Sequence, residues 1–101
     1  MLNQVVLVGR IASDLKVNEV DGEKKNTDII LAVPRSFKNS NGEYETDFIP
    51  CKLWNNIAQT TTEYCKQGDL VGIKGRLQSN EDKTITIVAE KVTFLSSKKE
   101  D

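Results

Sequence analysis

The chain has 101 residues and a mass of 11.3 kDa, and its 14 basic and 15 acidic residues give a formal net charge of −1. This length suits one domain, and 38% hydrophobic with 29% charged residues is a globular composition rather than a disordered one. The absence of histidine excludes Ser–His and Cys–His nucleophilic pairs and every histidine-based metal site.

The sequence shows no pattern of a membrane helix, a signal peptide or a cysteine-based site. No apolar run approaches the about 20 residues that a membrane helix needs, and residues 1–9 lack the basic and long apolar stretches of a signal peptide. The two cysteines, Cys51 and Cys65, suit neither a zinc site nor a disulfide framework. We therefore expect buried free thiols in a reducing, cytoplasmic compartment.

Branched aliphatic residues favour strands. Ile, Val and Leu number 25, of which 17 are Ile or Val, and branching at Cβ favours the pleated strand over the helix. Residues 2–11 predict a first strand, and their aliphatic run is typical of a strand covered on both faces. Gly9 within it indicates a bulge or a barrel corner. Residues 15–20 predict a short, weaker extension before the turn at Asp21-Gly22.

Two long strands are expected next. Residues 27–37 predict a second strand, Asn41-Gly42 predicts a tight turn, and residues 44–54 predict a third strand with clean alternation. The core face of this third strand is expected to carry Ile49, Cys51 and Leu53. The opposite face is expected to carry Phe48, Pro50, Lys52 and Trp54.

The hydrophobic period changes after residue 54. Residues 55–67 show a helical stripe, with Asn55 as the expected N-cap and Gly68 where the helix C-terminus favours a left-handed residue. Residues 69–78 and 84–95 predict a fourth and a fifth strand, and Ile85 and Ile87 are expected to face inward. Residues 96–101 predict a short charged, disordered tail.

This element order predicts an all-β fold. Five strands with one helix between the third and the fourth are typical of the OB fold, a partly open Greek-key barrel whose second and third strands bind oligonucleotides. Closing short strands into a barrel hides their edges. We expect residues 1–95 to form one such domain, with residues 96–101 outside it.

Aromatic residues mark a candidate binding face. Phe48 and Trp54 are expected on the solvent side of the third strand, and Phe37 lies near the end of the second. Arg35 and Lys52 are interleaved with them. Bases of single-stranded nucleic acid stack on such rings while cations follow the phosphates. The rings could equally pack against a partner subunit or under the loop at residues 38–44. A protein-interaction module, whose aromatic face contacts a partner protein, is a separate alternative.

The charge of the chain gives little evidence for nucleic-acid binding, and the sequence contains no catalytic motif. Arg10 and Arg76 lie near strand ends and could line a groove, but the slightly acidic chain lacks an overall basic footprint, so positive charge would have to gather on one face. There is no P-loop, dinucleotide-binding glycine motif or metal-ligand cluster. We therefore expect no enzyme activity, no metal and no cofactor.

Five segments resemble, in the same order, the bacterial single-stranded DNA-binding proteins, in particular their short form. They are MLNQVVLVGR (1–10), LAVPRSF (31–37), DFIPCKLW (47–54), YCKQGDLV (64–71) and GRLQ (75–78). The resemblance implies a homotetramer, or a dimer, that binds single-stranded DNA without sequence preference in replication, recombination or repair. It implies stacking on Phe37, Phe48 and Trp54, and basic contacts from Arg10, Arg35, Lys52 and Arg76.

Two features depart from the family pattern. Many members carry an aromatic residue in the hairpin between the last two strands, but residues 78–83 here contain none. Many members also end in an acidic tip that recruits repair enzymes, which the charged tail here does not resemble, so we expect no recruitment by that route. The alternative is an OB-fold protein-interaction module of the primosome or recombination-mediator type.

Overall fold

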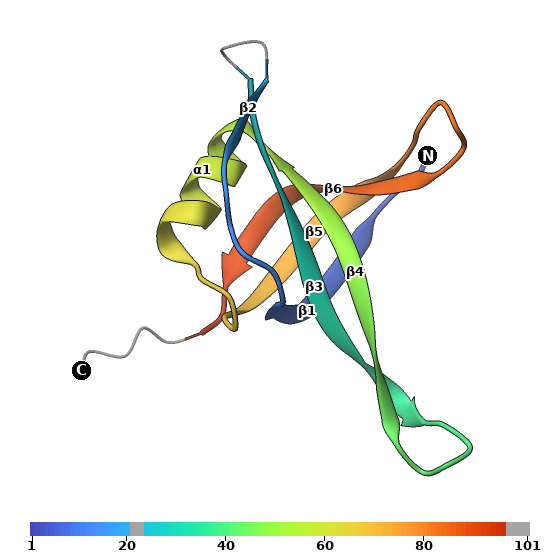
Figure 1. Cartoon of the computed structure of the whole chain (residues 1–101). Coiled ribbons are helices and arrows are strands. Elements are labelled where there is room, and N and C mark those ends of the chain that lie inside the picture. The colour runs from blue at the N-terminus through green and yellow to red at the C-terminus, as the bar shows by residue number, and fades with distance from the viewer. Residues whose placement is uncertain (21–23, 97–101) are drawn as a thin grey trace, which may run out of the picture.

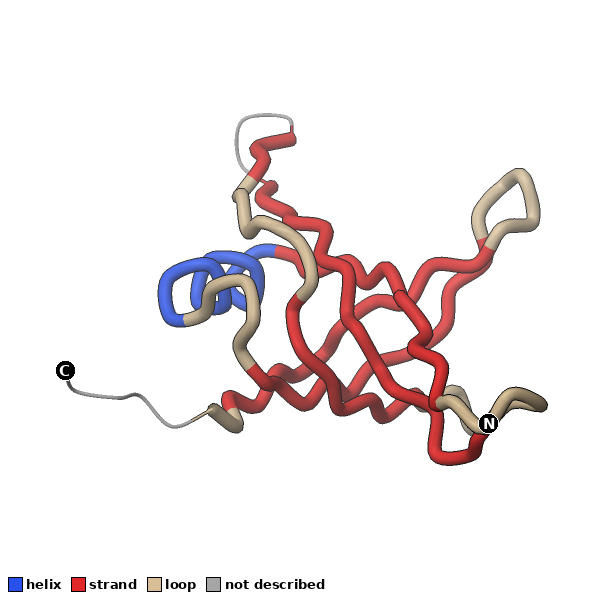
Figure 2. The backbone as a smooth tube through the Cα atoms, turned by 60° about the horizontal axis from the view of Figure 1, so that its bottom comes forward, coloured by secondary structure: helices blue, strands red, loops and turns tan. Residues whose placement is uncertain are grey.

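The computed structural model describes residues 1–20 and 24–96, and their six strands form one sheet that closes into a barrel (Figure 1). The strand order is β1-β5-β6-β4-β3-β2, and an additional pairing of β1 with β3 closes the barrel. Helix α1 lies against one end of the barrel (Figure 2). The elements are β1 (Val5–Ile11), β2 (Asn18–Val20), β3 (Lys24–Lys38), β4 (Tyr44–Trp54), α1 (Asn55–Tyr64), β5 (Leu70–Ser79) and β6 (Ile85–Phe94).

The predicted fold class is confirmed. Strands β1, β3, β4, β5 and β6 form the five-stranded barrel, and α1 lies between β4 and β5, which are the third and fourth of these strands. The weak extension predicted at residues 15–20 is the short strand β2, which pairs with the start of β3. Strand β3 begins three residues earlier than the predicted second strand because this pairing extends it.

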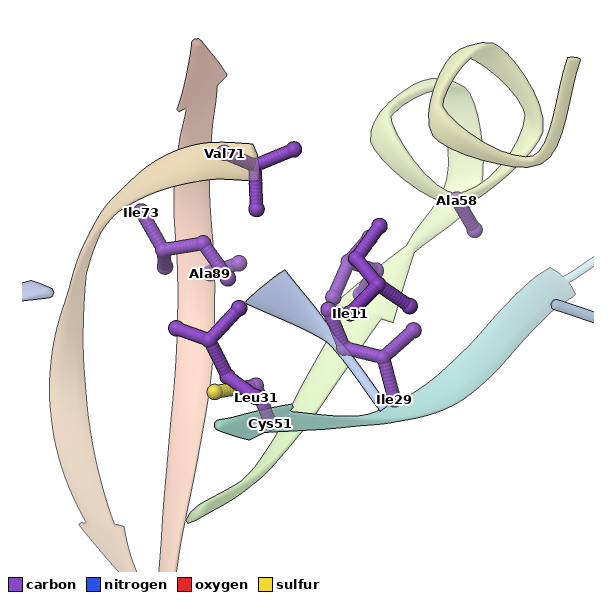
Figure 3. Close-up of a cluster of buried hydrophobic side chains, with 9 residues drawn as sticks. Ile11, Ile29, Leu31, Cys51, Ala58, Val71, Ile73 and Ala89 are labelled. Atoms are coloured by element: carbon purple, nitrogen blue, oxygen red, sulfur yellow. The ribbon is translucent and has the colours of Figure 1, made fainter. Parts of the chain in front are cut away.

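The barrel core follows the predicted alternation. On β4, Cys51 and Leu53 are buried, and Ile49 packs against the core. They meet Ile29 and Leu31 of β3, and Val71 and Ile73 of β5 (Figure 3). Ala58 and Thr61 are the buried residues of α1. Burial raises the pKa of the Cys51 thiol to about 11, so this group stays protonated at neutral pH.

Two glycines allow strands to approach closely. A Cβ on Gly9 would lie 2.3 Å from the carbonyl oxygen of Ala32, where β1 turns from β5 towards β3. This contact agrees with the barrel corner predicted at Gly9. A Cβ on Gly75 would lie 2.2 Å from the carbonyl oxygen of Val88, beside a register shift between β5 and β6.

Two predictions about strand burial do not hold within the single chain. Strand β1 is covered by the chain on one face only, because Val6 is 66% exposed and Val8 is also exposed on the face away from the core. Ile85 does not face inward: it is 58% exposed, because it begins β6 in a hairpin that projects beyond the packed part of the barrel. Ile87, two residues further, packs against the core as predicted.

The predicted helix boundaries are also wrong. Trp54, not Asn55, occupies the N-cap position, and no side chain caps the helix. Asn55 instead has a φ of +53°. The helix ends at Tyr64 rather than at residue 67. Gly68 has a φ of +99° in the following loop, where its N–H donates to the carbonyl of Ile11 and ties this loop to β1. Most of the predicted tail, residues 97–101, lies outside the described residues.

The close approach at Gly75 predicts a large penalty for a small substitution. Gly75→Ala should lower the free energy of unfolding by about 1–3 kcal/mol, because the added methyl group forces the backbone of β5 and β6 apart. Urea denaturation measures this change. Gly72→Ala in the same strand is the matched control, because its nearest contact would be an ordinary 3.6 Å. Equal stabilities of the two variants would contradict the prediction.

Candidate nucleic-acid interface

The outer face of the β3–β4 ribbon carries the candidate site. Because Cys51 and Leu53 point into the core, the alternating residues Phe48 and Trp54 point outward on β4. The antiparallel register places Ala32 opposite Phe48, Asp28 opposite Lys52 and Asn26 opposite Trp54. The ribbon extends past the barrel into the β3–β4 hairpin, away from α1 (Figure 1).

The three predicted rings differ in their placement. Phe48 is 64% exposed, and Trp54 is half-buried at the junction with α1. At 3.4 Å per residue their positions are about 20 Å apart along β4. Phe37 is also exposed, but it lies within the register shift between Pro34 and Lys38. It therefore does not continue the simple alternation of the other two rings.

Lys52 lies beside Trp54 and is paired with a carboxylate. Its Nζ is 5.6 Å from the centroid of the Trp54 ring and 3.2 Å from Oδ1 of Asp28. The ammonium therefore covers part of one face of the indole through a cation–π contact. Asp28 cannot be identified from the sequence, because only the register of β3 against β4 brings it to Lys52.

Arg35 lies in a cluster with two carboxylates. Its Nη2 donates to Asp47 Oδ1 at 2.9 Å, its Nε reaches the same carboxylate at 3.2 Å, and its Nη1 donates to Glu45 Oε1 at 2.7 Å. These hydrogen bonds hold the pKa of Asp47 below its usual range and raise the pKa of Arg35. One positive and two negative charges leave the cluster net negative.

The other two predicted cations lie on neighbouring strands. Nε of Arg76, on β5, lies 3.4 Å from Oε2 of Glu90. Val88 of β6 pairs with Arg76 on one side and with Lys52 on the other, so the three residues form one row across the sheet. Ala32 of β3 pairs with Arg10 of β1 on one side and with Phe48 on the other, so these residues also form one row across the sheet. Arg10 donates from Nη1 to the carbonyl of Gly68 at 3.0 Å, and within residues 1–20 and 24–96 no carboxylate oxygen lies within 4.0 Å of it.

Thus the structure brings most of the predicted site residues to one region. Phe48, Trp54 and Lys52 share the outer face of β4. Arg10 lies in the same row of the sheet as Phe48, on the β3 side, and Arg76 lies in the same row as Lys52, on the β6 side. Arg35 and Phe37 lie further out on the hairpin. In the described part of the chain, no group of three metal-ligating residues is found and no helix is long and apolar enough to cross a membrane.

Comparison with known proteins identifies relatives over nearly the whole chain. The single-strand binding protein family matches residues 2–95. Single-stranded DNA-binding protein B of Bacillus subtilis is 39% identical, over 97% of this chain and 94% of that protein. Single-stranded DNA-binding protein 1 of Clostridium acetobutylicum is 35% identical over 98% of both chains. Single-stranded DNA-binding protein 3 of Listeria innocua is 41% identical, but the match covers only 66% of its length.

A solved structure supports the fold independently. The SSB domain of a Synechococcus protein superimposes with a TM-score of 0.73 over 92% of this chain and 96% of that one, at 17% sequence identity. This similarity confirms the barrel architecture, and the sequence matches above carry the family assignment. The chain belongs to the single-strand binding protein family.

Proposed function

We propose that this chain binds single-stranded DNA by stacking bases on exposed rings of the β3–β4 ribbon. The observation that carries the proposal is Phe48, a large aromatic side chain that stays 64% exposed on the outer face of a barrel strand. A ring exposed in this way offers a free π-face on which an unpaired base can stack. Two relatives that match over nearly their whole length are named as single-stranded DNA-binding proteins.

Stacking on a ring selects unpaired strands. A base in a duplex already stacks on its neighbours, so it cannot lie against Phe48 or Trp54 without unwinding. An unpaired base has a free π-face, and all four bases have one, so this mode of binding tolerates any sequence. Phe37, further out on the hairpin, extends the proposed path of the strand.

We expect the basic side chains to contact phosphates, and their ion pairs within the chain indicate which of them contribute most. In the described part of the chain no carboxylate oxygen lies within 4.0 Å of Arg10, so a phosphate bound there displaces no ion pair. Lys52, Arg76 and above all Arg35 already interact with carboxylates. A phosphate must compete with these carboxylates, which lowers the net gain from each of these contacts.

We further propose that the chain forms a homotetramer in which β1 lies at an interface. In the described residues, β1 pairs with β3 only at Arg10 and Ile11, so one edge of its first part has no strand partner. Val6 and Val8 are exposed beside this edge. An open edge with an apolar face favours pairing with a second chain.

In this proposal residues 1–95 form a binding domain without catalysis or cofactor, which acts in the cytoplasm during replication, recombination or repair. Its role is to cover and protect unpaired DNA. The remaining possibility, a protein-interaction module whose rings contact a partner protein, is tested by the ring substitutions below.

The rings predict the effect of alanine substitution on affinity. Binding of an unstructured oligo-dT should quench Trp54 fluorescence much more than binding of a duplex. Phe48→Ala should weaken oligo-dT binding about 5- to 150-fold, the range for loss of one stacked base. Tyr64→Ala is the control, because Tyr64 is similarly exposed but lies on α1 against Phe94. Unchanged binding by a Phe48→Ala, Trp54→Ala double variant would favour the protein-interaction module.

The ion pairs predict which cation controls the salt dependence. Arg10→Ala should make the plot of log affinity against log salt less steep by about 0.7, the value for one phosphate contact on a single strand. Arg35→Ala should change the slope less, because Glu45 and Asp47 already neutralise that guanidinium. Fluorescence titrations at four or more salt concentrations measure both slopes. A larger change for Arg35→Ala would contradict the ranking.

The exposed face of β1 predicts an effect on assembly. Sedimentation equilibrium of the unaltered chain should give the mass of a tetramer. Val6→Lys should shift the mass towards smaller species, because it places a charge on an apolar contact. Tyr64→Lys adds the same charge at an exposed residue of α1 and should leave the mass unchanged. A monomeric unaltered chain would refute the proposed assembly.

A further inference from the structure

A pocket of about 200 Å³ lies between the outer face of the β3–β4 ribbon and the β5–β6 hairpin. No single segment of the chain builds it. Its lining includes Asp28 of β3, Pro50 and Lys52 of β4, and Asn80, Ile85 and Thr86 of the hairpin and β6.

The position of the pocket relates it to the proposed stacking site. Pro50 and Lys52 alternate outward on β4 between Phe48 and Trp54. A DNA strand with bases on both rings therefore passes over this pocket, so the inference below rests on the proposed function. The backbone positions of Phe48 and Trp54 are about 20 Å apart along β4, which leaves a nucleotide between them with a base that neither ring holds.

The walls of the pocket suit a flat heterocycle with a polar edge. Ile85 is 58% exposed and, with Pro50, offers apolar surface. Ile85 belongs to the β5–β6 hairpin, whose residues 78–83 contain no aromatic side chain. On the rim, Asn80 Nδ2 donates to the hydroxyls of Thr84 and Thr86 at 3.0 and 2.9 Å, which holds this side of the pocket in place.

Asp28 is the group that distinguishes one base from another. Its Oδ1 lies 3.2 Å from Lys52 Nζ, which fixes the carboxylate on the pocket wall, while its side chain remains 62% exposed. An ionised carboxylate only accepts hydrogen bonds and has room for more than one donor. The wall of the pocket therefore carries a carboxylate that can accept a further hydrogen bond.

We propose that this pocket takes one base and prefers cytosine to thymine, because the N4 amino group of cytosine donates a hydrogen bond to Asp28. Acidic side chains accept from this amino group in base recognition. Thymine has a carbonyl oxygen at the same position, so two acceptors would face each other without a proton, and leaving such groups unpaired is costly. The preference is added to general stacking and does not replace it.

The test is the ratio of affinities for oligo-dC and oligo-dT of equal length, measured by fluorescence anisotropy of labelled oligonucleotides. The two oligonucleotides differ in their own stacking, so the informative quantity is the change in this ratio on substitution. Asp28→Ala should lower the dC:dT affinity ratio about fivefold, the lower end for one base contact. Asp28→Asn should also lower it, because an amide can donate to thymine.

Two effects must be separated in this experiment. Removing Asp28 also frees Lys52, which strengthens contacts to phosphate equally for both oligonucleotides and leaves their ratio unchanged. Asp47→Ala is the matched control, because it removes a carboxylate beside Arg35 on the same ribbon but outside the pocket. It should raise both affinities at a constant ratio. Thermal melting checks that each variant is folded.

The outcomes distinguish this inference from the proposed function. If both oligonucleotides bind and Asp28→Ala leaves the ratio unchanged, Asp28 serves only Lys52 and the base pocket is refuted, while single-stranded DNA binding stands. If the unaltered chain binds neither oligonucleotide, the proposed function fails and the pocket fails with it.

Discussion

The two-residue repeat of β4 links the stability of this barrel to the chemistry of its surface. Cys51 and Leu53 are buried because they point inward, and the same pleat turns Phe48, Lys52 and Trp54 outward. A slip of one residue in the pairing with β3 would exchange the two faces and expose the core. The buried face therefore holds the outer face in one register, and the candidate site inherits the rigidity of the core.

The electrostatics of this surface are unusual for a nucleic-acid interface. Three of the four predicted cations lie beside carboxylates, and the whole chain has a formal charge of −1. A surface of this kind attracts DNA less from a distance than a basic one. In the proposed binding mode, stacking of bases on the rings would therefore contribute more of the affinity than phosphate contacts do. Stacking also distinguishes unpaired DNA from duplex.

Local pattern was enough for much of the architecture. Alternation identified the inward and outward residues of β4, and Gly9 marked the corner where β1 reaches β3. The predictions failed where neighbours outside the local sequence decide. Ile85 has the composition of a buried strand residue, but its hairpin projects past the core. Asn55 has the composition of an N-cap, but its backbone has a positive φ at the turn from β4 into α1.

The amino-acid order alone was sufficient for the strand and helix types, the barrel, the family and the outward direction of Phe48 and Trp54 on β4, because periodicity and short motifs are properties of neighbouring residues. It could not supply the ion pairs of Arg35 and Lys52 or the pocket beside Asp28. Those depend on strand register and on a hairpin that packs near β4, which bring together residues far apart in the chain. Only folding sets such distances: the pairing of β3 with β4 forms the ion pairs, and the pairing of β4 with β6 brings the walls of the pocket together.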